Sequence, residues 1–218
     1  MLDFTRFIWP SPRLESAAER KEREQHVEAI VSKIKTQEWA IELDTSLEEA
    51  RAIYSAEDER RKYADQKASI YLTLIAAIVP FSLPFVSDIW RGNNVLISQP
   101  VRICFFVSFA LALSYLVGGA WWSFRAISVS GYHRTDVEDL LQCWGSQHPK
   151  TRLTRKILCA AVRNRAGTNE KFTKAISAHQ FLIRAIIFFV ISTFIAIAGD
   201  DIYALILSAQ SVLLQIIC

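Results

Sequence analysis

The chain has 218 residues, of which 51% are hydrophobic and 22% are charged, and its formal net charge is +3. The charged residues lie almost entirely outside long uncharged runs, and this clustering excludes an ordinary soluble globular domain. The net charge hides an asymmetry. Residues 1–67 hold 12 Lys and Arg against 15 Asp and Glu, a net charge of −3, whereas residues 124–184 hold 11 against 4, a net charge of +7. We therefore expect a membrane protein with an acidic and a basic polar segment.

The first polar segment predicts a helix. Ser11-Pro12 is a typical N-cap followed by proline at the first helical position. The helix is very polar until an apolar stripe with helical spacing, made of Val27, Ile30, Val31 and Ile34. Such a stripe either binds a partner helix or packs on a neighbouring helix of the same chain. We favour packing, since the stripe is too short for a coiled coil.

The next helix is predicted to run from the polar segment into the first membrane span. Thr45-Ser46-Leu47-Glu48 is a capping box, which places the helix start near Ser46, and no proline or glycine follows before Pro80. Residues 68–87 carry no charge, and about 20 helical residues cover the roughly 30 Å hydrocarbon core of a bilayer. Pro80 and Pro84 predict a kink in this span.

The second span, residues 103–124, is uncharged throughout, and its helix is expected to continue to about Tyr132. Ala110, Ser114 and Gly118 recur every four residues, which predicts a smooth strip that another helix can approach closely. Packing against the first span and contact with a second subunit are both open at this point.

The second polar segment predicts two short helices. Thr135-Asp136-Val137-Glu138 is a capping box, and Gly145 and Pro149 end the helix that it starts. A basic helix follows, and Gly167-Thr168-Asn169 predicts a break in it. Five cations of this helix are candidate contacts for a nucleotide, a nucleic acid or anionic lipid: Arg152, Arg155, Lys156, Arg163 and Arg165. We favour the alternative that they pair with the acidic N-terminal helices or reflect the positive-inside rule.

The third span is predicted at residues 181–199. Gly199-Asp200-Asp201 resembles a tight helical hairpin, because glycine ends helices and aspartate starts them. The uncharged residues 202–218 then form either a short fourth span or an interfacial helix, and we favour four spans. The fold class is thus an all-α membrane protein with three to four transmembrane helices and cytoplasmic helical extensions. Its segments are residues 1–67, 68–132, 133–180 and 181–218.

Basic residues flank the spans on one side, which places the N-terminus and the segment at 125–180 in the cytoplasm. Asp65 and Lys67 lie at the mouth of the first span. Ionisable groups at this depth normally pair, and Lys171, Lys174 and Arg184 at the third span are the candidate partners of Asp65. With the kink at Pro80 and Pro84, Asp65 and Lys67 form a candidate hinge.

No catalytic motif is present. The sequence lacks a phosphate-binding glycine loop, a Gly-x-Ser-x-Gly elbow and a His-Glu-x-x-His motif. His133, Cys143, His148 and Cys159 lack the short ligand pairs of a zinc site. We expect no enzyme activity, no metal and no cofactor.

Two stretches carry a family resemblance. Tyr63-Ala64-Asp65-Gln66-Lys67-Ala68-Ser69 opens a span that a second span closely follows, and Asn169 and Lys171-Phe172-Thr173-Lys174 precede a further span. In this arrangement, residues 60–205 resemble bacterial antiphage membrane effectors, namely the Pycsar-type transmembrane effectors and the related SLATT families.

The resemblance implies a homo-oligomeric effector in the bacterial inner membrane. When infection is sensed, such an effector permeabilises or depolarises the membrane and causes abortive infection. Its cytoplasmic regulator would be a cyclic-nucleotide system or, as for the small transmembrane toxins of retrons, a reverse transcriptase–nucleic acid complex. The alternatives are a non-toxic membrane anchor or assembly subunit for a cytoplasmic complex, and a small channel.

Overall fold

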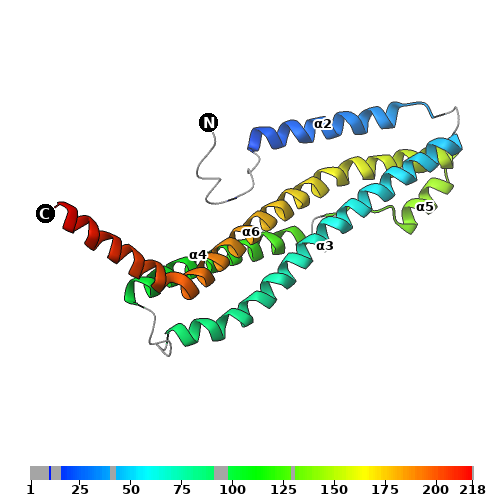
Figure 1. The fold of residues 1–218 in the computed structure, drawn as a ribbon. Helices are drawn as coiled ribbons and strands as arrows, with labels where there is room; N and C mark the ends of the chain where they lie inside the picture. The colour runs from blue at the N-terminus through cyan, green and yellow to red at the C-terminus, as the bar shows by residue number, and fades with distance from the viewer. Residues whose placement is uncertain (1–9, 11–15, 40–42, 91–97, 129–130, 218) are drawn as a thin grey trace. The chain divides into compact units, whose positions relative to one another are not determined.

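The computed structural model describes residues 10, 16–39, 43–90, 98–128 and 131–217. In this part of the chain it is helical with no strands, which confirms the all-α fold class. The helices are α2 (Ala17–Thr36), α3 (Leu43–Trp90), α4 (Gln99–Ile127), α5 (Val137–Trp144) and α6 (Pro149–Ile217) (Figure 1). Three of them, α3, α4 and α6, are long and apolar enough to cross a membrane.

The chain divides into two compact units. The apolar unit comprises residues 1–10, 70–123 and 177–218, and the polar unit comprises residues 11–69 and 124–176. The C-terminal part of α3, most of α4 and the C-terminal part of α6 belong to the apolar unit. The polar unit holds α2, α5 and the N-terminal parts of α3 and α6.

Two helix starts differ from the expected capping boxes. Helix α3 is already helical at Leu43, so Thr45 lies inside the helix and does not cap it. The cap of α5 is Asp136, whose side chain accepts from the N–H of Val137 at 2.7 Å, and its box partner is Asp139. It therefore lies one residue later than predicted.

The start of α2 at Ala17 has a capping box that the sequence contains but that we did not predict. The Glu19 N–H donates to Ser16 Oγ (3.2 Å), and the Ser16 N–H donates to Glu19 Oε2 (2.8 Å). The predicted start at Ser11-Pro12 lies outside the described residues.

Helix α6 is continuous, so the predicted break at Gly167 and the predicted hairpin at Gly199 are both wrong. At Gly199 the missing side chain serves packing, because a Cβ there would collide with Val101 of α4. Asp200 does not start a new helix. Its Oδ1 accepts the N–H of Ser98 at 2.8 Å, just before the first residue of α4, where a carboxylate complements the helix dipole. Residues 202–217 thus prolong α6 and are not a fourth helix.

Helix α4 ends at Ile127 and does not continue to Tyr132. Residues 131–136 have no helical structure. Both backbone groups of His133 bond to the Asn164 side chain: the N–H donates to Oδ1 (2.8 Å) and the carbonyl accepts from Nδ2 (2.9 Å). These bonds replace those that a longer helix would have provided.

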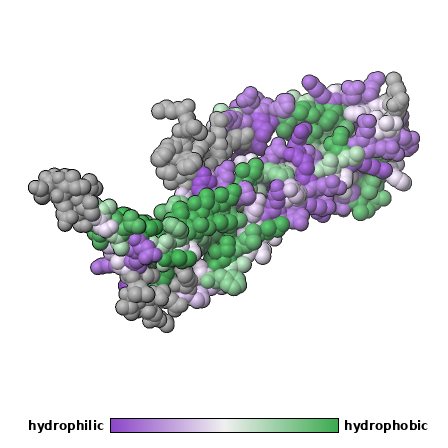
Figure 2. Space-filling view, in the orientation of Figure 1, coloured by the Kyte–Doolittle hydropathy of each residue, from purple (hydrophilic) through white to green (hydrophobic). Residues whose placement is uncertain are grey.

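Aromatic side chains fill the interior of the apolar unit. Phe181 is fully buried among Ile75, Tyr115 and Leu116, and Phe105 and Phe109 form a second cluster with Ile89. Many other large apolar side chains of the three helices point outward, and hydrophobic residues cover much of the visible surface of this unit (Figure 2). Such a surface suits a lipid environment.

The predicted small-residue strip divides between the two sides of α4. Gly118 is buried, and a Cβ there would lie 2.5 Å from the Phe181 ring, whereas Ala110 and Ser114 are exposed. The Ser114 hydroxyl donates to the Ala110 carbonyl of its own helix at 2.9 Å. Gly118 therefore packs within the chain, and Ala110 and Ser114 face its surroundings.

This division gives a first prediction. Gly118→Val should lower the free energy of unfolding in detergent by about 1–3 kcal/mol, because the buried Phe181 ring has no room to retreat. Ala110→Val, on the exposed side of the same helix, is the control and should leave stability unchanged. Equal effects of the two substitutions would contradict the assignment of the buried face.

Candidate functional site

A buried ion pair joins α3 and α6 within the polar unit. Lys171 Nζ lies 2.6 Å from Asp65 Oδ1. The Lys171 side chain is only 7% exposed, whereas that of Asp65 is 34% exposed. A lysine ammonium in such a place is stable only with a charged partner, because its desolvation costs several kcal/mol. Asp65 supplies that partner.

Aromatic and cationic side chains surround the pair. The Arg60 guanidinium donates to Asn169 Oδ1 (3.2 Å) and lies 5.7 Å from the centroid of the Phe172 ring. The Tyr63 ring packs against Phe172, with centroids 6.4 Å apart, and Lys67 Nζ lies 4.4 Å from the Tyr63 ring. The structure therefore brings together the two stretches on which the family resemblance depends. We call residues 60–67 and 169–172 the entry cluster.

The segment that follows α4 is fastened to the same two helices. Besides its bonds to Asn164, the His133 carbonyl accepts from the Tyr54 hydroxyl (3.4 Å), and the Arg61 guanidinium lies 4.0 Å from the Tyr132 ring. Desolvation, and then the nearby Tyr54 and Asp58, raise the pKa of Tyr132 above its usual range, so this phenol stays neutral at physiological pH. Within the polar unit, these contacts hold Tyr132 and His133 against α3 and α6.

Asn164 is a structural residue that the sequence analysis missed. It is buried and satisfies both backbone groups of His133, which lies 31 residues earlier. The sequence around Asn164 does not indicate this role, because its side chain binds the backbone of His133 and any residue could supply that backbone.

The other candidate partners of Asp65 make different contacts. Lys174 pairs with Glu170 of its own helix at 2.9 Å. Arg184, in the apolar unit, donates from Nη1 to the Gln180 carbonyl at 3.0 Å, which directs its guanidinium toward the N-terminal side of its helix, as a snorkelling arginine would. Of the three candidates, the structure places Lys171 against Asp65.

The basic residues of α6 contact polar groups inside the polar unit. Arg163 pairs with Glu28 of α2 (3.4 Å), Arg165 lies 3.9 Å from Glu57 of α3, and Lys156 pairs with Asp139 of α5. Arg155 donates to the Gln37 carbonyl (2.8 Å), and Arg152 donates to the Gln142 carbonyl (3.3 Å). Arg163 and Arg165 thus lie next to acids of the N-terminal helices, as the favoured interpretation expects, whereas Arg152 and Arg155 contact backbone carbonyls.

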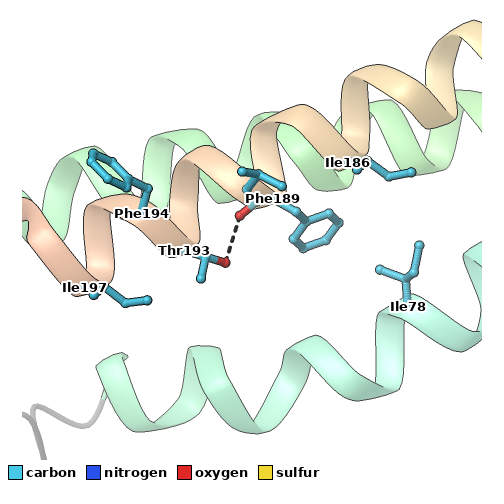
Figure 3. Close-up of a pocket in the computed structure, with 7 residues that line it drawn as sticks. Ile78, Ile186, Phe189, Thr193, Phe194 and Ile197 are labelled. Atoms are coloured by element: carbon cyan, nitrogen blue, oxygen red, sulfur yellow. Dashed lines mark hydrogen bonds between the residues drawn. The ribbon is translucent and has the colours of Figure 1, made fainter.

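The proline segment of α3 borders an apolar groove in the apolar unit. Helix α3 continues through Pro80 and Pro84, and both are exposed. One hollow of about 450 Å³ lies between α3 and α6 (Figure 3). A second hollow of about 510 Å³ adjoins it, and the two share Ile78, Phe189 and Thr193. The Thr193 hydroxyl donates to the Phe189 carbonyl at 2.9 Å and offers no free donor to the groove.

The residues considered for zinc do not converge. Cys143 is buried between α5, α3 and α6, beside Leu47 and Leu153. Within the described ranges, no three His, Cys, Asp or Glu side chains lie close enough together to hold a metal ion. No family model, curated protein or solved structure matches the chain.

The unequal burial of the ion pair gives a second prediction. Asp65→Asn leaves the Lys171 ammonium buried without a counter-charge and should cost about 3 kcal/mol of unfolding free energy. Lys171→Met leaves a carboxylate that water reaches, so it should cost about 1 kcal/mol. The double variant should resemble Lys171→Met. Denaturant titration of all four proteins in detergent measures the coupling, and additive effects would contradict a direct pair.

A third prediction concerns α5. The hydrogen bond from Lys156, followed by the backbone N–H of Asp136, lowers the pKa of Asp139 below its ordinary value of 3.8. The stability from this pair is therefore present above about pH 4 and is lost as the pH falls through the lowered pKa. The melting temperature of the wild type should exceed that of Asp139→Asn at pH 6, and the gap should shrink toward pH 2–3. A gap that does not depend on pH would show that the charge of Asp139 contributes nothing.

Proposed function

We propose that the chain is a membrane effector of a bacterial antiphage defence system, in the inner membrane with its N-terminus in the cytoplasm. When triggered, it permeabilises or depolarises that membrane and causes abortive infection. The observation that carries the proposal is the entry cluster, in which the two stretches that resemble such effectors meet around a buried ion pair.

The packing of the apolar unit supports an assembled active state. Phe105, Phe109 and Phe181 pack in the interior between the described helices of one copy. Conduction then requires either several copies or a rearranged bundle. The outward-facing apolar side chains and the exposed Ala110 and Ser114 leave surface for either route.

The Asp65–Lys171 pair is suited to hold the quiet state. It links α3 and α6, and both helices continue from the polar unit into the membrane spans. A regulator that draws either partner away leaves a buried charge unpaired, which favours rearrangement of the helices. In this proposal the regulator is a cyclic-nucleotide system or a reverse transcriptase–nucleic acid complex.

A second function, a non-toxic anchor for a cytoplasmic complex, is favoured by one observation. Helix α5 exposes Val137, Leu141 and Trp144 on the polar unit, and exposed apolar faces of this kind mark protein contacts. An anchor would bind its partner through this face without changing membrane potential.

The fourth prediction separates the two functions. Induced expression in a bacterium, alone or with phage challenge, should collapse membrane potential within minutes, as read by a potential-sensitive dye. Asp65→Ala should collapse the potential without phage challenge and sooner than the wild type does, because loss of the counter-charge of the buried Lys171 releases the quiet state.

Asp44→Ala is the matched control, because Asp44 forms an equally short 2.6 Å pair with Lys150 in an exposed position. It should depolarise like the wild type, at equal membrane content by immunoblot. Unchanged potential in the wild type under both conditions would exclude the effector and leave the anchor. Unchanged killing by Asp65→Ala would remove Asp65 from the mechanism.

A further inference from the structure

Helix α6 is longer than a membrane span. From Phe181 to Ile217 its mostly apolar part has 37 residues, or about 55 Å of helix, whereas the hydrocarbon core of a bilayer is about 30 Å thick. Residues 181–199 alone nearly fill that core. Because the helix continues without a break, residues 202–217 do not return through the membrane as a fourth span. These 16 residues, which we call the C-terminal segment, therefore lie outside the core that the span fills.

Contacts between α4 and α6 mark the depth at which the span of α6 ends. The Ser98 N–H donates to Asp200 Oδ1 at 2.8 Å, just before α4 begins, and Val101 occupies the space where a Cβ of Gly199 would lie. The first turn of α4 and the end of the α6 span thus lie at one depth. A carboxylate is costly in hydrocarbon, so this depth is a surface of the bilayer. The C-terminal segment begins there.

The C-terminal segment has a broad apolar side and a narrow polar one. Four of its large apolar side chains are between 44% and 71% exposed: Ile202, Leu205, Ile206 and Leu207. Three of its polar residues recur with helical spacing and share one side of the helix: Ser208, Ser211 and Gln215. Gln210 is the polar residue that lies apart from them. A helix of this kind suits the boundary between headgroups and acyl chains.

We propose that the C-terminal segment is an interfacial helix, which lies along the bilayer surface with its apolar side toward the acyl chains. Its direction supports this placement, because the red C-terminal part of α6 turns away from the orange span that precedes it (Figure 1). A straight continuation would carry the apolar side chains into water. Insertion across the bilayer is also disfavoured, since 16 residues form only about 24 Å of helix.

The partner of the segment is lipid, and its attachment does not depend on anionic headgroups. The segment contains no Lys or Arg, and Asp200 and Asp201 precede it. It therefore differs from the basic amphipathic helices that anionic lipid attracts, and burial of apolar surface alone must hold it. Lipid is favoured over a second copy because the preceding span keeps the segment at the bilayer surface, where lipid is always adjacent and another chain must first diffuse to it.

Depth-dependent fluorescence quenching tests the proposal on the full chain in phosphatidylcholine vesicles. A fluorescent coumarin amino acid replaces Ile206 or Leu213, which share the apolar side, or Ser211 on the polar side. The lipid carries bromine, a quencher, either near the headgroup end of its acyl chains or near the bilayer centre. Positions 206 and 213 should be quenched equally, and at least about twofold more by shallow than by deep bromine, because a helix parallel to the surface keeps one depth. Position 211 should be quenched less.

Three results would overturn the proposal. Deeper quenching at position 213 than at position 206 would show a segment that inserts into the core. No quenching at either position would show a segment surrounded by water. Quenching that rises as the protein is diluted with lipid would show that a second copy covers the apolar side.

A matched pair of substitutions probes the two sides of the helix, with the fluorescent residue at position 213. Ile206→Asp should lower the shallow quenching at least about twofold, because binding strength follows the buried apolar area. Ser208→Asp introduces the same charge on the polar side and should leave the quenching unchanged. Both proteins keep the three spans, so cosedimentation with the vesicles should be equal. Equal quenching in the two variants would contradict the assignment of the sides.

The proposal requires the spans to lie in a bilayer but does not require depolarisation. Shallow quenching without any change in membrane potential would retain the interfacial helix and reject the effector. Depolarisation without shallow quenching would do the reverse.

Discussion

Lys171 imposes the constraint on which the polar unit depends. Its ammonium is almost fully buried, and Asp65 is the counter-charge that makes this burial tolerable. Because the two residues lie on different helices, their pairing fixes how α3 and α6 align. Arg60, Asn169 and Phe172 then meet one turn away. Asn164 extends the arrangement to the segment after α4.

The apolar unit follows a different rule, because its outer surface and its interior are both apolar. The fit between side chains distinguishes the interior from the outer surface. For example, the Phe181 ring occupies the space that Gly118 leaves open because it has no side chain. Some of its polar side chains bond to their own helices, as the hydroxyls of Ser114 and Thr193 do, whereas the Ser108 hydroxyl donates to the Phe188 carbonyl of α6 at 3.2 Å. A helix that satisfies its own polar groups can face lipid or another helix at little cost.

The sequence predicted the features that depend on local composition. Uncharged runs of span length identified the three long apolar helices, and the depth of Asp65 required a basic partner. The predictions that were wrong concern features that depend on residues far away in the sequence. Gly199 and Asp200 look like a hairpin only if Val101 and Ser98, a hundred residues earlier, are ignored. The buried face of α4 likewise became visible only with Phe181, which packs against Gly118, whereas Ala110 and Ser114 are exposed.

The packed interior of the spans bears on the proposed function. Phe105, Phe109 and Phe181 occupy the interior between the described helices of one copy, so the proposed permeabilising state requires contacts between copies or a rearranged bundle. In the proposed function, the Asp65–Lys171 pair stays intact until a regulator acts on the polar unit, because the buried Lys171 ammonium needs its counter-charge.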